Sequence, residues 1–548
     1  DYNLLDDVTR VTYPDSTFVV ITYSTAIPHL VEAVTDRAGK TTSYSYDTLN
    51  HLTGLVRPDG SAFSYVRDAN GNLTAATDPN GNTTRIKYDL DNRPIQEIYP
   101  DGTTLNRTFR SAGLLETITQ ADGRWFQLQF DEMFNLTSMT GSTLDGAFNV
   151  YDAYNRRISM TDSRGETSYN YDAASRLTSV IGPAGSGTIT LTYDNAGRRT
   201  GLEIDGRTIT YAYDALGRVT GVTEAGKSHV FGYAGANPLP GSITRPSGSV
   251  TTVLRDSLNR PQQVGNKKSN SSLINRFAYT YAPGRKLPAS ETVTGGATPP
   301  VVPSALQIYG YDSMNQPLSG TSPDRTYTWD QNGNLITGYA ADGSILTATY
   351  DELNRLMTLE FTDTGGVARR TEYVYDGDGR LAAATESADS VPVREAKFVR
   401  LGPLLLQERD GTGAVVRDYT WSGSAGRGST LLGIRQGGAD YEYLFDGRGR
   451  VAALIDGTQT VAAAYSYDPF GAPYSSGSFK QPFRSSFSEF DERAGLYQFS
   501  SRFFLPNPGA MISRQVTTQP GGLPAGNHFR PLRLLEMRPT AALQGSLP

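Results

Sequence analysis

Short runs in which apolar and polar residues alternate recur along the chain, and a polar cluster separates each run from the next. In residues 211–222, Tyr211 and Tyr213 are alternate residues before an Asp-x-x-Gly cluster, and Thr220 and Val222 are alternate residues after it. A period of two predicts β-strands. The Asp can accept hydrogen bonds from backbone amides of the turn, and the Gly supplies a positive φ. The stretch therefore predicts a β-hairpin.

This pattern repeats with a nearly constant spacing. Steps of 21 residues separate six consecutive positions: Asp47, Asp68, Asp89, Arg110, Asp131 and Asp152. Later copies carry the same aspartate: Asp172, Asp194, Asp214, Asp312, Asp351, Asp376, Asp446 and Asp468. Arg110 lacks a carboxylate, yet the spacing does not change there. We therefore interpret the aspartates as turn residues of a repeat array and not as a row of acidic sites.

The repeat predicts an all-β chain, a long antiparallel β-hairpin array with about 21 residues per unit. Each hairpin would cover the open strand edge of its neighbour, so the array stabilises units that are marginal alone. The expected parts are an array at 1–283, an irregular loop at 284–306, an array at 307–468 with a degenerate insert at about 384–440, a closing segment at 469–508, and an Arg-containing tail at 509–548.

Composition narrows the classes of function. The net charge is −6 and the pI is near 5.5, which argues against a general nucleic-acid surface. No run approaches the roughly 18 apolar residues of a membrane helix. Cys is absent, so disulfides, thiolate metal sites and Cys nucleophiles are excluded. The chain begins at Asp1 within a repeat, with neither Met nor a signal peptide, and we interpret it as a portion of a longer or processed polypeptide.

No cofactor or metal site is predicted. The four histidines lack metal-ligand spacing: His29, His51, His229 and His528. Residues 68–72 and 330–334 resemble the opening of a calcium loop. Leu73 and Leu335 stand where that loop needs Gly, so calcium binding is not expected.

Two sets of residues carry a resemblance to a known family. The unit Tyr-x-Tyr-Asp-x-x-Gly-Arg at Tyr211–Arg218, repeated at Tyr373–Arg380, resembles the YD repeat of RHS proteins. A second set resembles the RHS core end that closes the array: Pro469, Gly471, Pro482, Phe483, Arg484, Gly495, Leu496, Tyr497 and Arg502. Similar patterns occur in bacterial RHS toxins, in C-type subunits of insecticidal toxin complexes and, more distantly, in teneurins. The resemblance covers about residues 1–508.

The resemblance implies a long sheet that spirals into a hollow shell. In bacterial members of the family, such a shell encloses a variable C-terminal toxin polypeptide. We therefore expect a secreted or cell-surface, non-catalytic shell that encloses or presents a C-terminal polypeptide, with a larger toxin or secretion assembly as a further partner. The alternative is an extracellular adhesin or structural surface protein that binds glycans or partner proteins, as the teneurin likeness suggests.

One family feature does not carry over. In much of the family, the core end continues into a Gly-Arg-Phe-Leu-Ser-x-Asp-Pro motif linked to aspartate-dependent self-cleavage. The matching segment here is 509–516, in which Gln515 and Val516 stand where Asp and Pro are expected. No Asp follows Asp491. We therefore predict no self-cleavage and no catalytic residue, and we interpret the tail as a plug or a lead-in to a further segment.

Overall fold

The computed structural model describes residues 1–144, 146–282, 285, 287–295, 308–321, 324–423, 429–468, 470–499, 501–506 and 508–514. Strands and turns make up the secondary structure of these residues. No helix in them is long and apolar enough to cross a membrane. The all-β class and the long antiparallel repeat array predicted from the alternation are confirmed.

The first large sheet has 27 strands, and each pairs antiparallel with the next strand in the sequence. Its strands are β1 Arg10–Thr12, β2 Phe18–Tyr23, β3 Val31–Thr35, β4 Thr41–Tyr46, β5 Leu52–Val56, β6 Ala62–Arg67, β7 Leu73–Thr77, β8 Thr83–Tyr88, β9 Pro94–Ile98, β10 Thr104–Phe109, β11 Leu115–Thr119, β12 Trp125–Phe130, β13 Leu136–Gly141, β14 Ala147–Tyr151, β15 Arg157–Asp162, β16 Gly165–Tyr171, β17 Leu177–Ile181, β18 Thr188–Tyr193, β19 Arg199–Ile204, β20 Arg207–Tyr213, β21 Val219–Glu224, β22 Lys227–Gly232, β23 Ser242–Thr244, β24 Val250–Arg255, β25 Pro261–Lys267, β26 Leu273–Thr280 and β27 Ser290–Thr294.

A second large sheet of 14 strands continues the meander. Its strands are β31 Thr328–Trp329, β32 Leu335–Tyr339, β33 Ile345–Tyr350, β34 Leu356–Thr362, β35 Ala368–Tyr375, β36 Leu381–Ala388, β37 Val391–Leu401, β38 Leu404–Arg409, β39 Val415–Trp421, β40 Leu431–Gln436, β41 Ala439–Phe445, β42 Val451–Asp456, β43 Val461–Tyr467 and β44 Pro473–Ser476.

Two small sheets complete the described chain. One comprises β28 Tyr309–Tyr311, β29 Pro317–Gly320 and β30 Arg325–Thr326, and the other comprises β45 Phe483–Ser485, β46 Ser488–Asp491, β47 Leu496–Phe499, β48 Arg502–Leu505 and β49 Ala510–Met511. The five-stranded sheet coincides with most of the segment that resembles the RHS core end.

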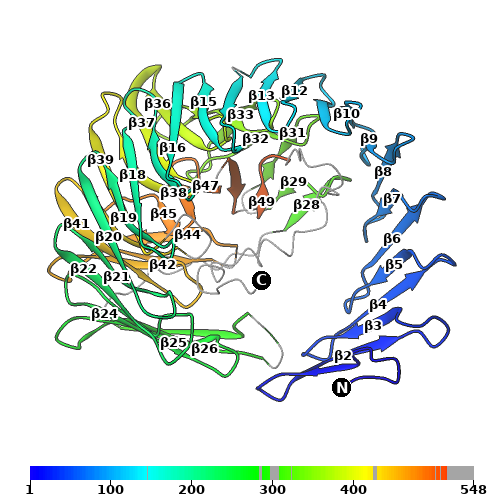
Figure 1. Cartoon of the computed structure of the whole chain (residues 1–548), viewed down its shortest axis with the longest axis horizontal. Helices are drawn as coiled ribbons and strands as arrows, with labels where there is room; N and C mark the ends of the chain where they lie inside the picture. The colour runs from blue at the N-terminus through cyan, green and yellow to red at the C-terminus, as the bar shows by residue number, and fades with distance from the viewer. Residues whose placement is uncertain are drawn as a thin grey trace.

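The two large sheets outline an incomplete ring (Figure 1). The first sheet runs from β2 round to β26, and the sheets are not closed. The second sheet follows the first over its later part, from the region of β12 to that of β24. β28, β29 and β49 lie within the outline of the ring. A right-handed twist at every strand pair accumulates over so many strands and curls the sheet.

A shared hydrophobic core holds the two large sheets together. Leu202 and Val222 of the first sheet belong to the same buried cluster as Leu404, Tyr419 and Trp421 of the second, and each of these five side chains is 2% exposed or less. Burial of such side chains is the main favourable term in folding. The sheets therefore pack face to face along this stretch.

Two parts of the chain whose sequence departs from the repeat are also built from strands. Residues 384–440 span β36 to β41, which pair in order within the second sheet. Within 284–306, residues Ser290–Thr294 form β27 and pair with β26. Apolar–polar alternation over a few residues is enough to extend an existing sheet edge, even where the turn motif is absent. Residues 296–307 and 515–548 lie outside the described residues.

Candidate functional site

The repeated aspartates bind the backbone of their own turns. The Oδ1 atom of Asp214 accepts hydrogen bonds from the amides of Leu216 and Arg218, both at 2.9 Å. The same pair of bonds, to the amides two and four residues later, occurs at Asp47, Asp89, Asp131, Asp152, Asp172, Asp194, Asp312, Asp351, Asp446 and Asp468. Asp376 accepts from the Arg380 amide at 2.7 Å. These carboxylates are engaged in turn structure.

The turn at Arg110 keeps the backbone geometry without the acid. The Arg110 amide donates to the Leu114 carbonyl, and the Gly113 amide donates to the Arg110 carbonyl, both at 2.9 Å. Gly113 has a φ of +80°, and the residue at this turn position elsewhere is Gly217 at +79° or Asn50 at +67°. The left-handed residue and the two backbone hydrogen bonds therefore define the turn, and the aspartate reinforces it.

Tyr and Arg of the motif connect each repeat to the next. The Tyr213 hydroxyl donates to the Arg199 carbonyl at 2.7 Å, across the neighbouring strand. The Arg198 guanidinium pairs with Asp194 at 2.6 Å, lies 4.8 Å from the centroid of the Tyr213 ring, and donates to the Asp214 carbonyl at 3.2 Å. Similar Arg-over-aromatic contacts occur at Arg93, Arg156, Arg176, Arg218, Arg260, Arg355 and Arg450. From the sequence, only the aspartate is predicted to have a role in the turn. The Arg that stands four residues after the aspartate in many repeats is the signal from which the contacts between repeats could have been predicted.

Turns of the first sheet contact the second sheet along a line that we call the intersheet seam. The seam comprises residues 78–80, 120–124, 142–143, 157–162, 205–207, 224–227 and 245–249 of the first sheet, and residues 315, 330–334, 350–354, 377–378, 409, 418–420 and 440–443 of the second and its approach. No local sequence pattern marks these long-range contacts.

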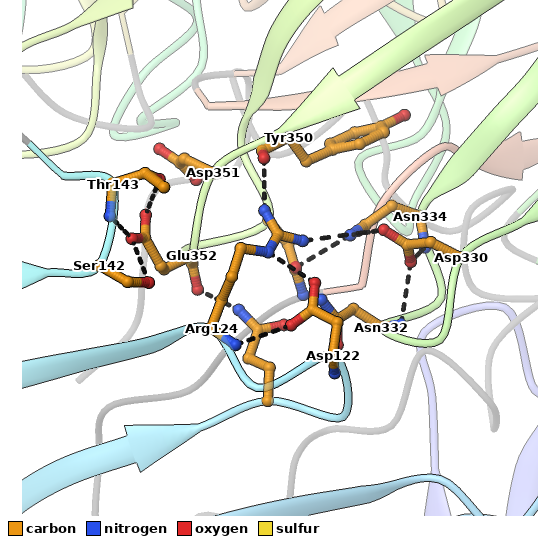
Figure 2. Close-up of polar contacts among 12 residues, drawn as sticks. Asp122, Arg124, Ser142, Thr143, Asp330, Asn332, Asn334, Tyr350, Asp351 and Glu352 are labelled. Atoms are coloured by element: carbon orange, nitrogen blue, oxygen red, sulfur yellow. Dashed lines mark hydrogen bonds and ion pairs between the residues drawn. The ribbon is translucent and has the colours of Figure 1, made fainter.

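Glu352 is fully buried in the seam. Its carboxylate accepts hydrogen bonds from the Ser142 hydroxyl at 2.8 Å and the Thr143 hydroxyl at 2.7 Å, and also from the Thr143 amide (Figure 2). Burial raises the pKa of Glu352, but these hydrogen bonds outweigh it and hold the pKa below its ordinary value. The carboxylate therefore stays ionised as a seam contact.

Arg124 lies beside Glu352 in the seam (Figure 2). Its guanidinium pairs with Asp122 at 2.6 Å, lies 3.8 Å from Asp330, and donates to the Tyr350 carbonyl. Further along, Asp378 accepts from both terminal nitrogens of Arg157 at 2.6 and 2.8 Å. Such two-point arginine–carboxylate contacts fix orientation as well as charge.

The core-end motif packs onto the second large sheet. Phe483 lies 5.2 Å from Tyr419 and 5.8 Å from Trp421, measured between ring centroids. Arg484 is buried, pairs with Glu492 at 2.8 Å, and donates to the Gln481 carbonyl at 2.8 Å. Other contacts lie within the core-end segment: the Pro482 carbonyl accepts from the Phe490 amide, and the Tyr497 hydroxyl donates to the Gly471 carbonyl at 2.6 Å. Gly495 has a φ of +73° and lies against Ala341, and Leu496 is 1% exposed. Pro469 lies outside the described residues.

The last described residues are held inside the ring by both large sheets. The Ile512 carbonyl accepts from the Leu335 amide at 2.8 Å and the Tyr350 hydroxyl at 3.0 Å. The Arg502 guanidinium, whose pKa burial lowers to about 10, donates to the Ser513 carbonyl at 3.3 Å. The Asn354 side chain donates to the Arg514 carbonyl at 3.1 Å. We call residues 508–514 the exit segment, because the chain beyond it starts from this point.

The described residues contain no group of three or more His, Asp and Glu side chains arranged to hold a metal ion. The predicted turn aspartates lie in separate turns along the array, and each binds its own backbone. Gln515 and Val516, the positions at which the self-cleavage motif differs, lie outside the described residues.

Comparison with known families gives four matches along the first sheet. The RHS Repeat family model matches residues 29–62, 67–104, 151–188 and 202–229. The chain contains RHS repeats. This confirms the resemblance inferred from the Tyr-Asp units. The matched residues fall within the first large sheet, whose turns carry the Asp and Arg contacts described above.

Curated relatives match part of this chain. The tRNA3(Ser)-specific nuclease WapA of Bacillus spizizenii is 28% identical over 194 residues, which is 34% of this chain and 7% of the relative. The double-stranded DNA deaminase toxin A of Burkholderia cenocepacia is 26% identical over 225 residues, 36% of this chain and 16% of the relative. The chain thus spans a small fraction of the length of these relatives.

Solved RHS structures share the fold. TcdB2-TccC3 without its hypervariable C-terminal region gives a TM-score of 0.73 at 15% identity, covering 100% of this chain and 33% of that one. The Tc holotoxin pore of Photorhabdus luminescens, with a TccC3 mutation, gives a TM-score of 0.72 at 15% identity, covering 100% of this chain and 34% of that one. At this identity the likeness shows the fold, which is that of the Tc toxin RHS shell.

Proposed function

We propose that this chain forms part of the wall of an RHS-type shell that encloses or presents the polypeptide continuing from its exit segment. The observation that carries the proposal is the anchoring of residues 508–514 within the ring outline, against both large sheets. A polypeptide that continues from this point begins on the inner side of the wall. The wall would therefore act by surrounding or presenting that polypeptide.

The role proposed for the wall is structural and not catalytic. The carboxylates that recur along the array are engaged by turn amides and arginines, and the seam carboxylates are engaged by hydroxyls and arginines. A catalytic group needs a free position beside a reacting atom. The nuclease and deaminase activities named for the relatives are activities of those proteins. Their matches to this chain support only a similarity over about a third of its length.

The proposed partners are the enclosed polypeptide and a larger toxin or secretion assembly, in a secreted or cell-surface protein. Support comes from the fold shared with TcdB2-TccC3 and from the toxin named among the relatives. Glycan recognition, the basis of the adhesin alternative, has no specific contact in its favour, since tyrosines of the repeat motif use their hydroxyls within the sheet.

A protease-protection experiment tests the proposal. A flexible reporter segment with a single protease site is fused after Pro548 in one protein and before Asp1 in a matched protein. We expect cleavage of the C-terminal reporter to be at least tenfold slower than cleavage of the N-terminal reporter. Equal cleavage rates would overturn the proposal.

A further inference from the structure

A cavity of about 440 Å³ lies between the first sheet and the second. Its lining comes from strands β20 to β25 and the turns between them, from residues 422–423, 429–430, 445–447 and 449, and from residues 485–487. The lining is largely apolar and includes Phe231, Leu239, Ile243, Val264, Phe445 and Phe487. Cavities of this size and character are typical of sites that bind small organic molecules.

Arg245 places a buried cation in the lining of this cavity. The residue is 4% exposed, its Nε donates to the Tyr443 carbonyl at 3.2 Å, and its Nη1 has no hydrogen-bond partner among the described residues. Burial lowers the pKa of Arg245 to about 10, so the guanidinium remains charged at neutral pH. The charge of Glu442 opposes this shift, but within the described chain Glu442 and Arg245 form no ion pair.

The acidic groups near Arg245 are engaged elsewhere. Glu442 accepts from the Ser247 amide at 2.8 Å, the Ser247 hydroxyl at 2.5 Å and the Ser249 hydroxyl at 3.1 Å. Asp446, which also lines the cavity, pairs with Arg450 at 2.7 Å. The cavity's second arginine, Arg218, pairs with Asp214 at 2.6 Å. Arg245 therefore stands out as the cation that lacks a direct counterion.

A buried charge without a partner is costly, and an anion that pairs with it regains part of that cost. We propose that the cavity binds a small amphipathic carboxylate, whose carboxylate pairs with the Arg245 guanidinium and whose hydrocarbon part occupies the apolar cavity. An arginine can hold a carboxylate through two parallel hydrogen bonds, which a neutral head group cannot accept in the same way. The site is independent of the proposed shell function.

Calorimetric titration with decanoate and decan-1-ol tests this site, because the two probes share a chain length and differ in charge. We expect decanoate to bind the wild-type protein at least tenfold more tightly than decan-1-ol. Arg245→Met should remove that preference and leave the affinity for decan-1-ol unchanged. Absence of decanoate binding at millimolar concentration, or equal affinities of the wild type for both probes, would overturn the proposal.

Two further variants locate the binding. Arg255→Met removes another partly buried arginine of the same sheet, outside the cavity lining, and should leave decanoate affinity unchanged. Ile243→Trp fills the cavity and should weaken both probes at least tenfold. If Arg245→Met fails to fold, Ile243→Trp and the wild-type preference for decanoate decide the question. Unchanged decanoate affinity in Ile243→Trp would place binding elsewhere and refute the site.

Discussion

The guanidinium of Arg514 lies over the ring of Tyr99, with its Cζ atom 4.0 Å from the ring centroid. Tyr99 belongs to the turn after β9 of the first large sheet. The carbonyl of the same Arg514 accepts a hydrogen bond from Asn354, in a turn of the second large sheet. One residue of the exit segment therefore contacts both sheets.

A double-mutant cycle measures this contact. We expect Arg514→Ala and Tyr99→Leu to show a coupling free energy of about 1 kcal/mol in chemical denaturation, since a partly exposed cation–π pair contributes on this order. Tyr99→Phe serves as the control, because it keeps the ring and removes only the hydroxyl that donates to Glu97 at 2.9 Å. Additive effects of the Ala and Leu substitutions would show that the contact carries no energy.

The ion pair of Arg157 and Asp378 should contribute to docking of the second sheet. Both side chains are about a quarter exposed or less, at 24% and 21%. We expect Asp378→Ala to lower the free energy of unfolding by about 1–3 kcal/mol, between the values for exposed and buried pairs. The control is Asp91→Ala, whose side chain is 72% exposed and pairs with Arg93 two residues away. Comparable losses in both variants would contradict a special role for the seam.

Acid should weaken the seam. Five seam carboxylates share a pKa below the ordinary value: Asp205, Glu224, Glu352, Asp378 and Asp440. Burial alone would raise these pKa values, but hydrogen bonds outweigh it, joined at every group except Glu352 by the charge of an Arg or Lys. A carboxyl group with a lowered pKa in the folded state contributes stability above its unfolded pKa, near about 4, and that contribution is lost as the pH falls through the folded pKa.

We therefore expect the melting temperature to change little between about pH 7 and pH 5 and to fall steeply below about pH 4. Burial raises the pKa of Asp351, Asp376 and Glu291, so their protonation acts in the opposite direction. Thermal scans across this pH range measure the net effect. A melting temperature that rises from pH 5 to pH 3 would show that the seam carboxylates do not dominate.

Two adjacent acidic residues of one turn, Asp131 and Glu132, allow a turn-forming aspartate to be compared with an exposed surface charge. Asp131 accepts from the Met133 amide at 2.9 Å, the Asn135 amide at 2.8 Å and the Asn135 side chain at 3.0 Å. Glu132 is exposed. We expect Asp131→Ala to lower the melting temperature by about 1–3 °C, because two turn amides lose their acceptor, and Glu132→Ala to leave it unchanged. Equal shifts would contradict the capping role.

Local structure was predictable from the sequence because each hairpin is specified within one period. The alternation around Asp214 and the Asp-x-x-Gly turn determine strands β20 and β21. The unchanged spacing at Arg110 already indicated that the period matters more than the acid, and the backbone hydrogen bonds of that turn explain why.

The docking of the two sheets was not predictable in the same way. Glu352 sits at the second position of a turn whose sequence resembles every other Tyr-Asp turn, yet it is fully buried against Thr143. That contact depends on the curvature accumulated over many strand pairs, which no local pattern encodes. The same holds for Arg157 and Asp378.

Thiol labelling tests the central claim most directly, because the chain contains no Cys. Gln515→Cys places a thiol just after the exit segment, and Leu90→Cys places one on an exposed turn. A small maleimide and a maleimide carried on a long polyethylene glycol chain label each variant. The account predicts that the small reagent labels both thiols, whereas the large reagent labels position 90 at least tenfold faster than position 515. Equal labelling of both positions by the large reagent would contradict an exit segment that lies on the inner side of the wall.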